Sequence, residues 1–195
     1  FEGAKLRWLG RPVLRYLDAL LPPVDVERAR RTLAQFGLSA GEYVLVVPGG
    51  GTAHRGAENA PAIVAQAAAR IASHGRPTLL VGIADPGVAV PLLQACGPLP
   101  VGPFSDLLRN AGLVVSNGGD TMLQALACGR ACIAVPIAGD QQHRIDRCAQ
   151  QGVVVSAPLE AEAMERHAVG LLEDGALRDG LAARLAGSGI KDGMT

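Results

Sequence analysis

The 195-residue sequence has few aromatic residues and no excess of charge of either sign. Only 3% of its residues are Phe, Trp or Tyr although 49% are hydrophobic, so the core must be built from Ala, Val, Leu and Ile. Aliphatic strands of this kind suit a sheet that helices cover on both faces. Because 18 basic residues balance 18 acidic ones, no global charge attracts nucleic acid, and we expect no such partner.

Membrane spans, metal-binding patterns and dinucleotide motifs are also missing. No apolar run approaches the length of a transmembrane helix and no signal peptide is visible, which favours a cytoplasmic location. The four cysteines form no C-x-x-C pair, and the histidines have no matching ligand spacing. We therefore expect no metal and no cofactor, and we expect reduced thiols that are mostly buried.

Strand-length apolar runs alternate with helical patterns along the whole chain. This alternation predicts an α/β, Rossmann-like, doubly wound parallel sheet of about six strands. We expect this sheet to form one domain at residues 25–186, followed by a flexible tail at residues 187–195. The strands are predicted at residues 43–47, 78–81, 99–101, 113–116, 131–135 and 153–155. Helices are expected between them, including one after Asp85-Pro86.

The first 24 residues mix arginines with apolar side chains. One interpretation is a basic segment that lies on a membrane surface. The other, which we favour, is an interdomain linker, because Pro12 and Pro22-Pro23 interrupt any long helix. Since the chain begins at Phe1 rather than at Met, we expect it to be a fragment.

Two strand–turn–helix units follow one another between Leu113 and Gln150. The first strand ends in Asn117-Gly118-Gly119, after which Asp120 or Thr121 can cap a helix. The second ends at Pro136, and Asp140 can cap the next helix. Both helices begin beside strand ends, where α/β sheets bind their ligands. Backbone N–H groups and helix dipoles at such places suit an anion such as a diphosphate.

A third glycine-rich loop follows the first strand, with three consecutive glycines at residues 49–51. The loop is neither the dinucleotide G-x-G-x-x-G nor a Walker loop, which disfavours a nicotinamide dehydrogenase. It is either an ordinary strand-to-helix turn or a phosphate-binding loop. In the second case Arg55 is a better phosphate partner than His54, because arginine keeps its charge. A pair of solvated side chains is the alternative.

The central stretch resembles the nucleotide-sugar-binding motif of GT-B glycosyltransferases. The similarity is closest to UDP-glycosyltransferases and to the N-acetylglucosaminyltransferase that forms lipid II. It covers residues 10–184 and corresponds to the C-terminal half of such an enzyme. The pattern GG-x-x-T…AL-x-x-G…P-x-x-x-DQ is matched by Gly118, Gly119, Thr121, Ala125, Leu126, Gly129, Pro136, Asp140 and Gln141.

The resemblance implies a role for each part of the site. The loop at residues 102–105 would hold the base, with Phe104 over its face, although a core Phe is an equal alternative. Gln124 would meet the ribose, and Asp140 and Gln141 would hold the sugar. The glycine turns would hold the diphosphate through Gly50, Gly51, Thr52, Arg55, Asn117, Gly118, Gly119, Asp120 and Thr121.

Three positions depart from the family pattern. Gln124 replaces a Glu, and because hydrogen bonds to neutral groups are weaker, nucleotide affinity is expected to fall. Asn117 stands where many relatives have His or Arg. Arg144 replaces an Asn of plant-type members; it could meet phosphate or sugar, but we favour an i,i+4 ion pair with Asp140.

The resemblance implies the donor-binding domain of a bacterial-type, inverting, metal-independent glycosyltransferase that uses a UDP-sugar. In this family the general base lies in the N-terminal, acceptor-binding domain, so no catalytic residue is assigned here. We expect the chain to be inactive without that domain or a partner subunit. Peripheral association of the whole enzyme with the inner face of the membrane is left open. The alternatives are half of a UDP-sugar hydrolase or epimerase, and a degenerate, non-catalytic binding module.

Overall fold

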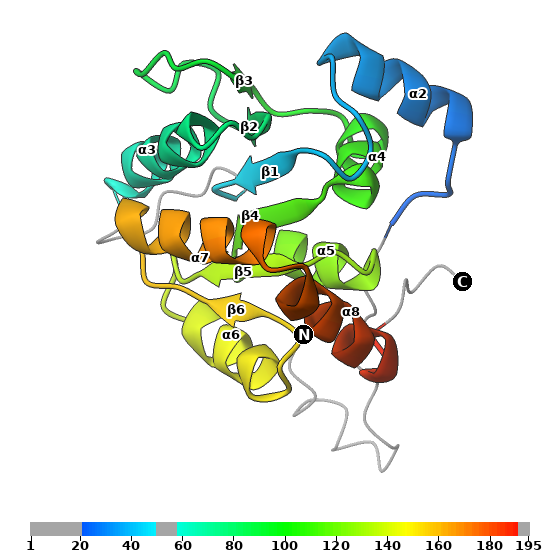
Figure 1. Ribbon diagram of the computed structural model, residues 1–195, viewed down its shortest axis with the longest axis vertical. Coiled ribbons are helices and arrows are strands. Elements are labelled where there is room, and N and C mark those ends of the chain that lie inside the picture. Colours follow the sequence, from blue (N-terminus) through cyan, green and yellow to red (C-terminus); the bar gives the residue numbers. More distant parts are fainter. Residues whose placement is uncertain (1–20, 50–57, 191–195) are drawn as a thin grey trace, which may run out of the picture.

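The computed structural model describes residues 21–49 and 58–190 of the chain (Figure 1). Six strands in these ranges form one all-parallel sheet with the order β3-β2-β1-β4-β5-β6. The predicted α/β, Rossmann-like fold is therefore confirmed. The strands are β1 Val44–Val47, β2 Thr78–Val81, β3 Leu93–Cys96, β4 Leu113–Asn117, β5 Cys132–Val135 and β6 Val155–Ser156.

Helices cover both faces of the sheet (Figure 1). Alternate side chains of each strand enter opposite cores: Leu45 and Val47 pack under α4, α5 and α6, while Val44 and Val46 pack under α3 and α7. No helix in the described ranges has the length and hydropathy needed to span a bilayer. The helices are α2 Val26–Gln35, α3 Ala60–Ser73, α4 Val101–Asn110, α5 Asp120–Ala127, α6 Gln141–Gln150, α7 Ala161–Glu173 and α8 Gly175–Gly187.

The third strand is the main error of the sequence prediction. It lies at Leu93–Cys96 rather than at residues 99–101, and residue 101 already begins α4. Pro98 and Pro100 flank Leu99 and have no N–H to donate, so this run cannot pair as a strand. The true strand lies at the sheet edge and is only half-buried, so it lacks the apolar signal of the inner strands.

The expected helix after Asp85-Pro86 is also absent from the described structure. The Asp85 carboxylate instead accepts a hydrogen bond of 2.9 Å from the backbone N–H of Gly87. An aspartate that bonds two residues ahead forms a turn of its own, which competes with the start of a helix. Asp85 does bond a backbone N–H group that follows it, as a helix cap would, but this bond closes a turn and does not start a helix.

The predicted helix caps are only partly correct. Asp25 caps α2, because its Oδ1 accepts from the N–H of Arg28 at 2.9 Å. Asn59 and Asp140 occupy the N-cap positions of α3 and α6, but neither side chain makes a capping bond. The N-cap of α5 is Gly119 rather than Asp120 or Thr121, and no side chain caps this helix.

Helix α2 lies beside α4 near one edge of the sheet (Figure 1), and an ion pair joins the two helices. Arg28 meets the Asp106 carboxylate with Nε 2.6 Å from Oδ2 and Nη2 3.1 Å from Oδ1. The Asp106 side chain is only 1% exposed, so this two-bond contact is what keeps a buried carboxylate satisfied. The hydrogen bond to Asp106 raises the pKa of Arg28, which stays charged throughout the ordinary pH range.

The turn before β1 and the turn before β4 touch through their backbones. Gly41 donates to the carbonyl of Asn110 at 2.8 Å, and a Cβ added at Gly112 would lie 2.2 Å from the Gly41 oxygen. Only glycine permits this approach, because a backbone neighbour cannot swing aside. The contact aligns the starts of the two central strands.

We therefore predict that Gly112→Ala destabilises the fold by about 1–3 kcal/mol or more, through backbone displacement. Gly170→Ala is the matched control. A Cβ at Gly170 in α7 meets nothing within 4 Å, and removal of a helical glycine is worth about 0.5–1 kcal/mol in stability. Urea unfolding of both variants measures the difference, and equal stabilities would contradict the contact.

Candidate functional site

The strand order reverses between the two central strands, β1 and β4. β1 pairs with β2 on one side and with β4 on the other. The chain leaves β1 towards α3, which packs on one face, and leaves β4 towards α5, which packs on the other. Because the connections diverge here, the carboxyl ends of β1 and β4 mark the position at which open α/β sheets generally bind their ligands.

Asn117 fills the space between the turns that follow these two strands. A Cβ added at Gly49 would lie 2.4 Å from Asn117 Nδ2, and one at Gly119 would lie 3.2 Å from Asn117 Oδ1. Gly49 also has φ +111°, a conformation that side chains disfavour. Both glycines therefore make room for one amide side chain at the reversal point. This packing role was not predicted, since it depends on residues 68 positions apart.

Gly118 lets helix α6 approach the β4–α5 turn, which we define as Gly118–Gly119. A Cβ at Gly118 would lie 2.7 Å from Cδ1 and Cγ1 of Ile145 and 3.0 Å from Cβ of Gln141. Gly118 is also bonded to β5, because its N–H donates to the Val135 carbonyl at 3.2 Å. The turn after β4 and the first turn of α6 are thus in direct contact.

Gln141 supports the β5–α6 loop, residues 136–140. Its Oε1 accepts from the N–H groups of Ile137 at 2.9 Å and Ala138 at 3.3 Å, and the residue is 5% exposed. The acceptor oxygen is therefore already used by the protein, and only the amide nitrogen could serve a ligand. Its predicted contact with the sugar stays a prediction, while its loop-holding role was not foreseen.

Arg144 connects α6 to the β4–α5 turn. Its Nη1 donates to the carbonyl oxygen of Gly118 at 2.6 Å, and its Nη2 lies 3.6 Å from Asp140 Oδ2. The favoured i,i+4 pair with Asp140 is present, but the shorter contact is the one to the turn. A sequence pattern within α6 could not reveal a bond to a carbonyl 26 residues away.

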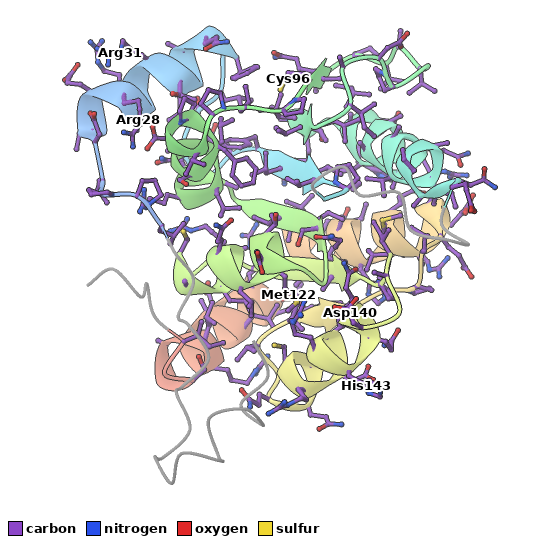
Figure 2. All side chains as sticks on the ribbon, turned by 180° about the vertical axis from the view of Figure 1, so that it is seen from behind. Arg28, Arg31, Cys96, Met122, Asp140 and His143 are labelled. Atoms are coloured by element: carbon purple, nitrogen blue, oxygen red, sulfur yellow. The ribbon has the colours of Figure 1, made fainter. Side chains whose placement is uncertain are left out.

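The remaining predicted residues fall into three groups. Asp120, Thr121 and Gln124 lie on α5, where Asp120 is exposed and the other two are half-buried. Asp140 lies at the start of α6, labelled in Figure 2, and its side chain is 71% exposed. Gly50, Gly51, Thr52 and Arg55 lie outside the described residues, so their predicted contacts with phosphate stay predictions.

Phe104 lies in helix α4 and not in a loop. The predicted loop at residues 102–105 is wrong, because these residues form the first turns of α4. Phe104 is half-buried and packs against the core that contains Leu107 and Leu108. The alternative of a core Phe therefore has structural support, and a contact with the base stays a prediction.

No cluster of three or more His, Cys, Asp or Glu that could hold a metal occurs within residues 21–49 and 58–190. The four cysteines are free, with Cys132 buried and the others half-buried, so the expectation of buried thiols is met in full only at Cys132. Burial raises the pKa of Cys132 to about 12, which keeps this thiol protonated and unreactive. The polar groups placed above at or near the β4–α5 turn include backbone N–H groups, the side chains of Asn117 and Gln141, and the charged side chains of Asp120, Asp140 and Arg144.

No protein-family model matches the chain, and no curated protein sequence matches it. Solved structures do resemble it. A structure described as a UDP-N-acetylglucosamine 2-epimerase from Listeria monocytogenes has a TM-score of 0.61 at 19% identity, over 90% of this chain and 46% of that one. The structure of Os79 from O. sativa in complex with UDP has a TM-score of 0.60 at 18% sequence identity, over 79% of this chain and 37% of that one. The structure of the spinosyn forosaminyltransferase SpnP has a TM-score of 0.63 at 17% sequence identity, over 92% of this chain and 47% of that one.

These similarities confirm the predicted resemblance at the level of the fold. The chain has the Rossmann-like fold of one half of GT-B glycosyltransferases. It spans less than half the length of each of these three structures.

We predict that Gly118→Ala pushes α6 off the turn and destabilises the fold by about 1–3 kcal/mol. The reason is the 2.7 Å approach to Ile145, whose side chain is fully buried. Ile145→Val alone should cost about 0.5–1.5 kcal/mol, but it should cost less in the Gly118→Ala background, because it removes Cδ1, one of the two Ile145 carbons that would lie 2.7 Å from the added Cβ. A double-mutant cycle by urea unfolding measures this coupling, and strictly additive effects would contradict the contact.

Proposed function

We propose that this chain is the donor-binding half of an inverting, metal-independent glycosyltransferase whose donor is a UDP-sugar. The observation that carries the proposal is the β4–α5 turn. A glycine pair at the reversal of strand order leads directly into α5, whose N-terminus no side chain caps. A helix start with open backbone donors at this position suits the diphosphate of a nucleotide sugar.

In this proposal the backbone N–H groups of residues 119–121 bind the diphosphate. The dipole of α5 adds about 0.3–1 kcal/mol at an exposed site and up to about 2 kcal/mol when partly buried. Negative charge grows on the diphosphate as the glycosidic bond breaks, so fixed donors there stabilise the transition state. This account needs no metal, because the backbone donors and the dipole supply the favourable field.

The exposed carboxylate of Asp140 is the proposed partner of the sugar hydroxyls. It lies at the start of α6, beside the β4–α5 turn. Asp140 would fix the orientation of the sugar, but it would not deprotonate an acceptor. We propose that the base comes from an acceptor-binding N-terminal domain or from a partner subunit, without which the chain binds donor and transfers no sugar. That the chain spans less than half of its structural neighbours supports this division of roles.

The likeness to the epimerase structure favours a second candidate, half of a UDP-sugar hydrolase or epimerase. Both candidates share a nucleotide site and differ in the acceptor. Once the other half is supplied, a hydrolase or epimerase converts a UDP-sugar with no added acceptor, whereas a transferase leaves it intact until an acceptor is present. Chromatography of a UDP-sugar after incubation with the chain and its other half, without an acceptor, distinguishes them.

We predict that UDP binds the chain with a dissociation constant on the order of millimolar or below, which corresponds to about 4 kcal/mol or more of binding free energy. Isothermal titration calorimetry in the presence and in the absence of a chelator is the measurement. Chelation should leave the affinity unchanged. Absence of binding at millimolar UDP would favour a non-catalytic module, and strict dependence on a divalent metal would contradict the backbone-based site.

Gln124→Glu should strengthen UDP binding by about 1 kcal/mol, the difference between a neutral hydrogen bond and a charge-assisted one. The prediction requires the side chain at position 124 of α5 to reach the ribose hydroxyls. Gln66→Glu, on the exposed face of α3, introduces the same charge away from the turn and should leave affinity unchanged. Equal or weaker binding by Gln124→Glu would show that this side chain points elsewhere.

A further inference from the structure

The Gly118–Gly119 pair is a weak point of the proposed site, because glycine restricts backbone rotation least of all residues. Diphosphate binding requires N–H groups that already point at the ligand. Some contact must therefore hold the peptide unit between these two glycines in one orientation. The described structure offers one strong candidate, the 2.6 Å bond from Arg144 Nη1 to the Gly118 carbonyl oxygen.

The orientation of that carbonyl determines the orientation of the first donor. Gly118 C=O and Gly119 N–H belong to the same peptide unit, which is planar and trans, as are all described peptide bonds. In a trans unit the two groups point in opposite directions. Because Arg144 holds the carbonyl on the side of α6, the Gly119 N–H is directed away from α6. A bond from a charged donor also polarises the peptide unit and makes its N–H a better donor.

The same guanidinium reaches the proposed sugar ligand. Its Nη2 lies 3.6 Å from Asp140 Oδ2, and the side chains of Arg144 and Asp140 are 38% and 71% exposed. An exposed pair of this kind adds little to stability. The effect of the pair is instead on geometry. One planar guanidinium contacts both the turn proposed to bind the diphosphate and the carboxylate proposed to bind the sugar. Arginine suits this task because its fork carries several donors in fixed directions, which lysine lacks.

We infer that Arg144 is a positioning residue: it fixes the direction of the Gly119 N–H and the place of the Asp140 carboxylate, and so prepares the site for a nucleoside diphosphate sugar. The inference rests on the proposed function. In this inference Arg144 acts through its neighbours and not through a bond to phosphate: Nη1 donates to Gly118 and Nη2 lies within ion-pair range of Asp140. The family pattern does not supply this role, since plant-type relatives carry an Asn here.

Binding measurements provide the first test. Arg144→Met should weaken UDP and UDP-sugar binding about tenfold, the value of one charge-assisted hydrogen bond. Arg147→Met, on the same helix and exposed, removes the same charge and should change affinity less than about twofold. Arg144→Lys should recover only part of the loss, because it replaces a fork by one point charge. The inference would be overturned if Arg144→Met bound UDP as tightly as the wild type, or if Arg144→Lys had the full wild-type affinity.

Amide NMR provides a test that needs no nucleotide. In the free protein, Arg144→Met should shift the Gly119 amide resonance and speed its hydrogen exchange, while Arg147→Met should leave both unchanged. Weakened binding with an unmoved Gly119 amide would mean that Arg144 contacts the ligand directly, which overturns the positioning role. If the wild-type chain binds no nucleotide, the proposed function fails, whereas the Gly119 amide still decides whether Arg144 holds the turn.

Discussion

The contact between the backbone of Gly118 and helix α6 is the constraint on which the site depends. Ile145 and the first turn of α6 approach so closely that no side chain fits at position 118. This approach places Gln141 and Arg144 where they reach the β5–α6 loop and the β4–α5 turn. A single helix therefore holds both the β5–α6 loop and the β4–α5 turn, and a glycine at position 118 makes that arrangement possible.

A second amide side chain completes the framework at the reversal of strand order. Asn117 occupies the space that the missing side chains of Gly49 and Gly119 leave open. Glycines at these positions leave space that larger side chains occupy: Asn117 lies against Gly49 and Gly119, and Ile145 lies against Gly118. Since the chain carries no net charge, an anion must be recognised by oriented backbone donors and by helix dipoles rather than by an overall basic surface.

The sequence predicted the features that depend on local patterns. Five of the six strands were placed within two residues, because buried aliphatic runs such as Leu113–Val115 carry a strong signal. The half-buried edge strand Leu93–Cys96 carries a weaker one, and it was missed. Asp85 shows why a helix start is hard to predict from a capping residue alone, because an aspartate side chain can either cap a helix or close a turn.

The roles inside the site were less predictable, because several depend on contacts across the fold. Asn117 packs against Gly49 and Arg144 bonds the Gly118 carbonyl, and neither contact follows from the residues next to them in the sequence. Gln141 was predicted as a sugar ligand, and the structure shows its oxygen bonded to the loop. Phe104 was placed in a loop, and the structure places it in α4 against the core.

The central claim is that backbone donors at the start of α5 bind a diphosphate. A crystal structure of the chain with UDP tests it most directly. The account predicts both phosphates at the β4–α5 turn, with the N–H groups of residues 119–121 about 2.7–3.2 Å from phosphate oxygens. Phosphates that lie elsewhere on the protein, with these N–H groups bonded only to water, would contradict it.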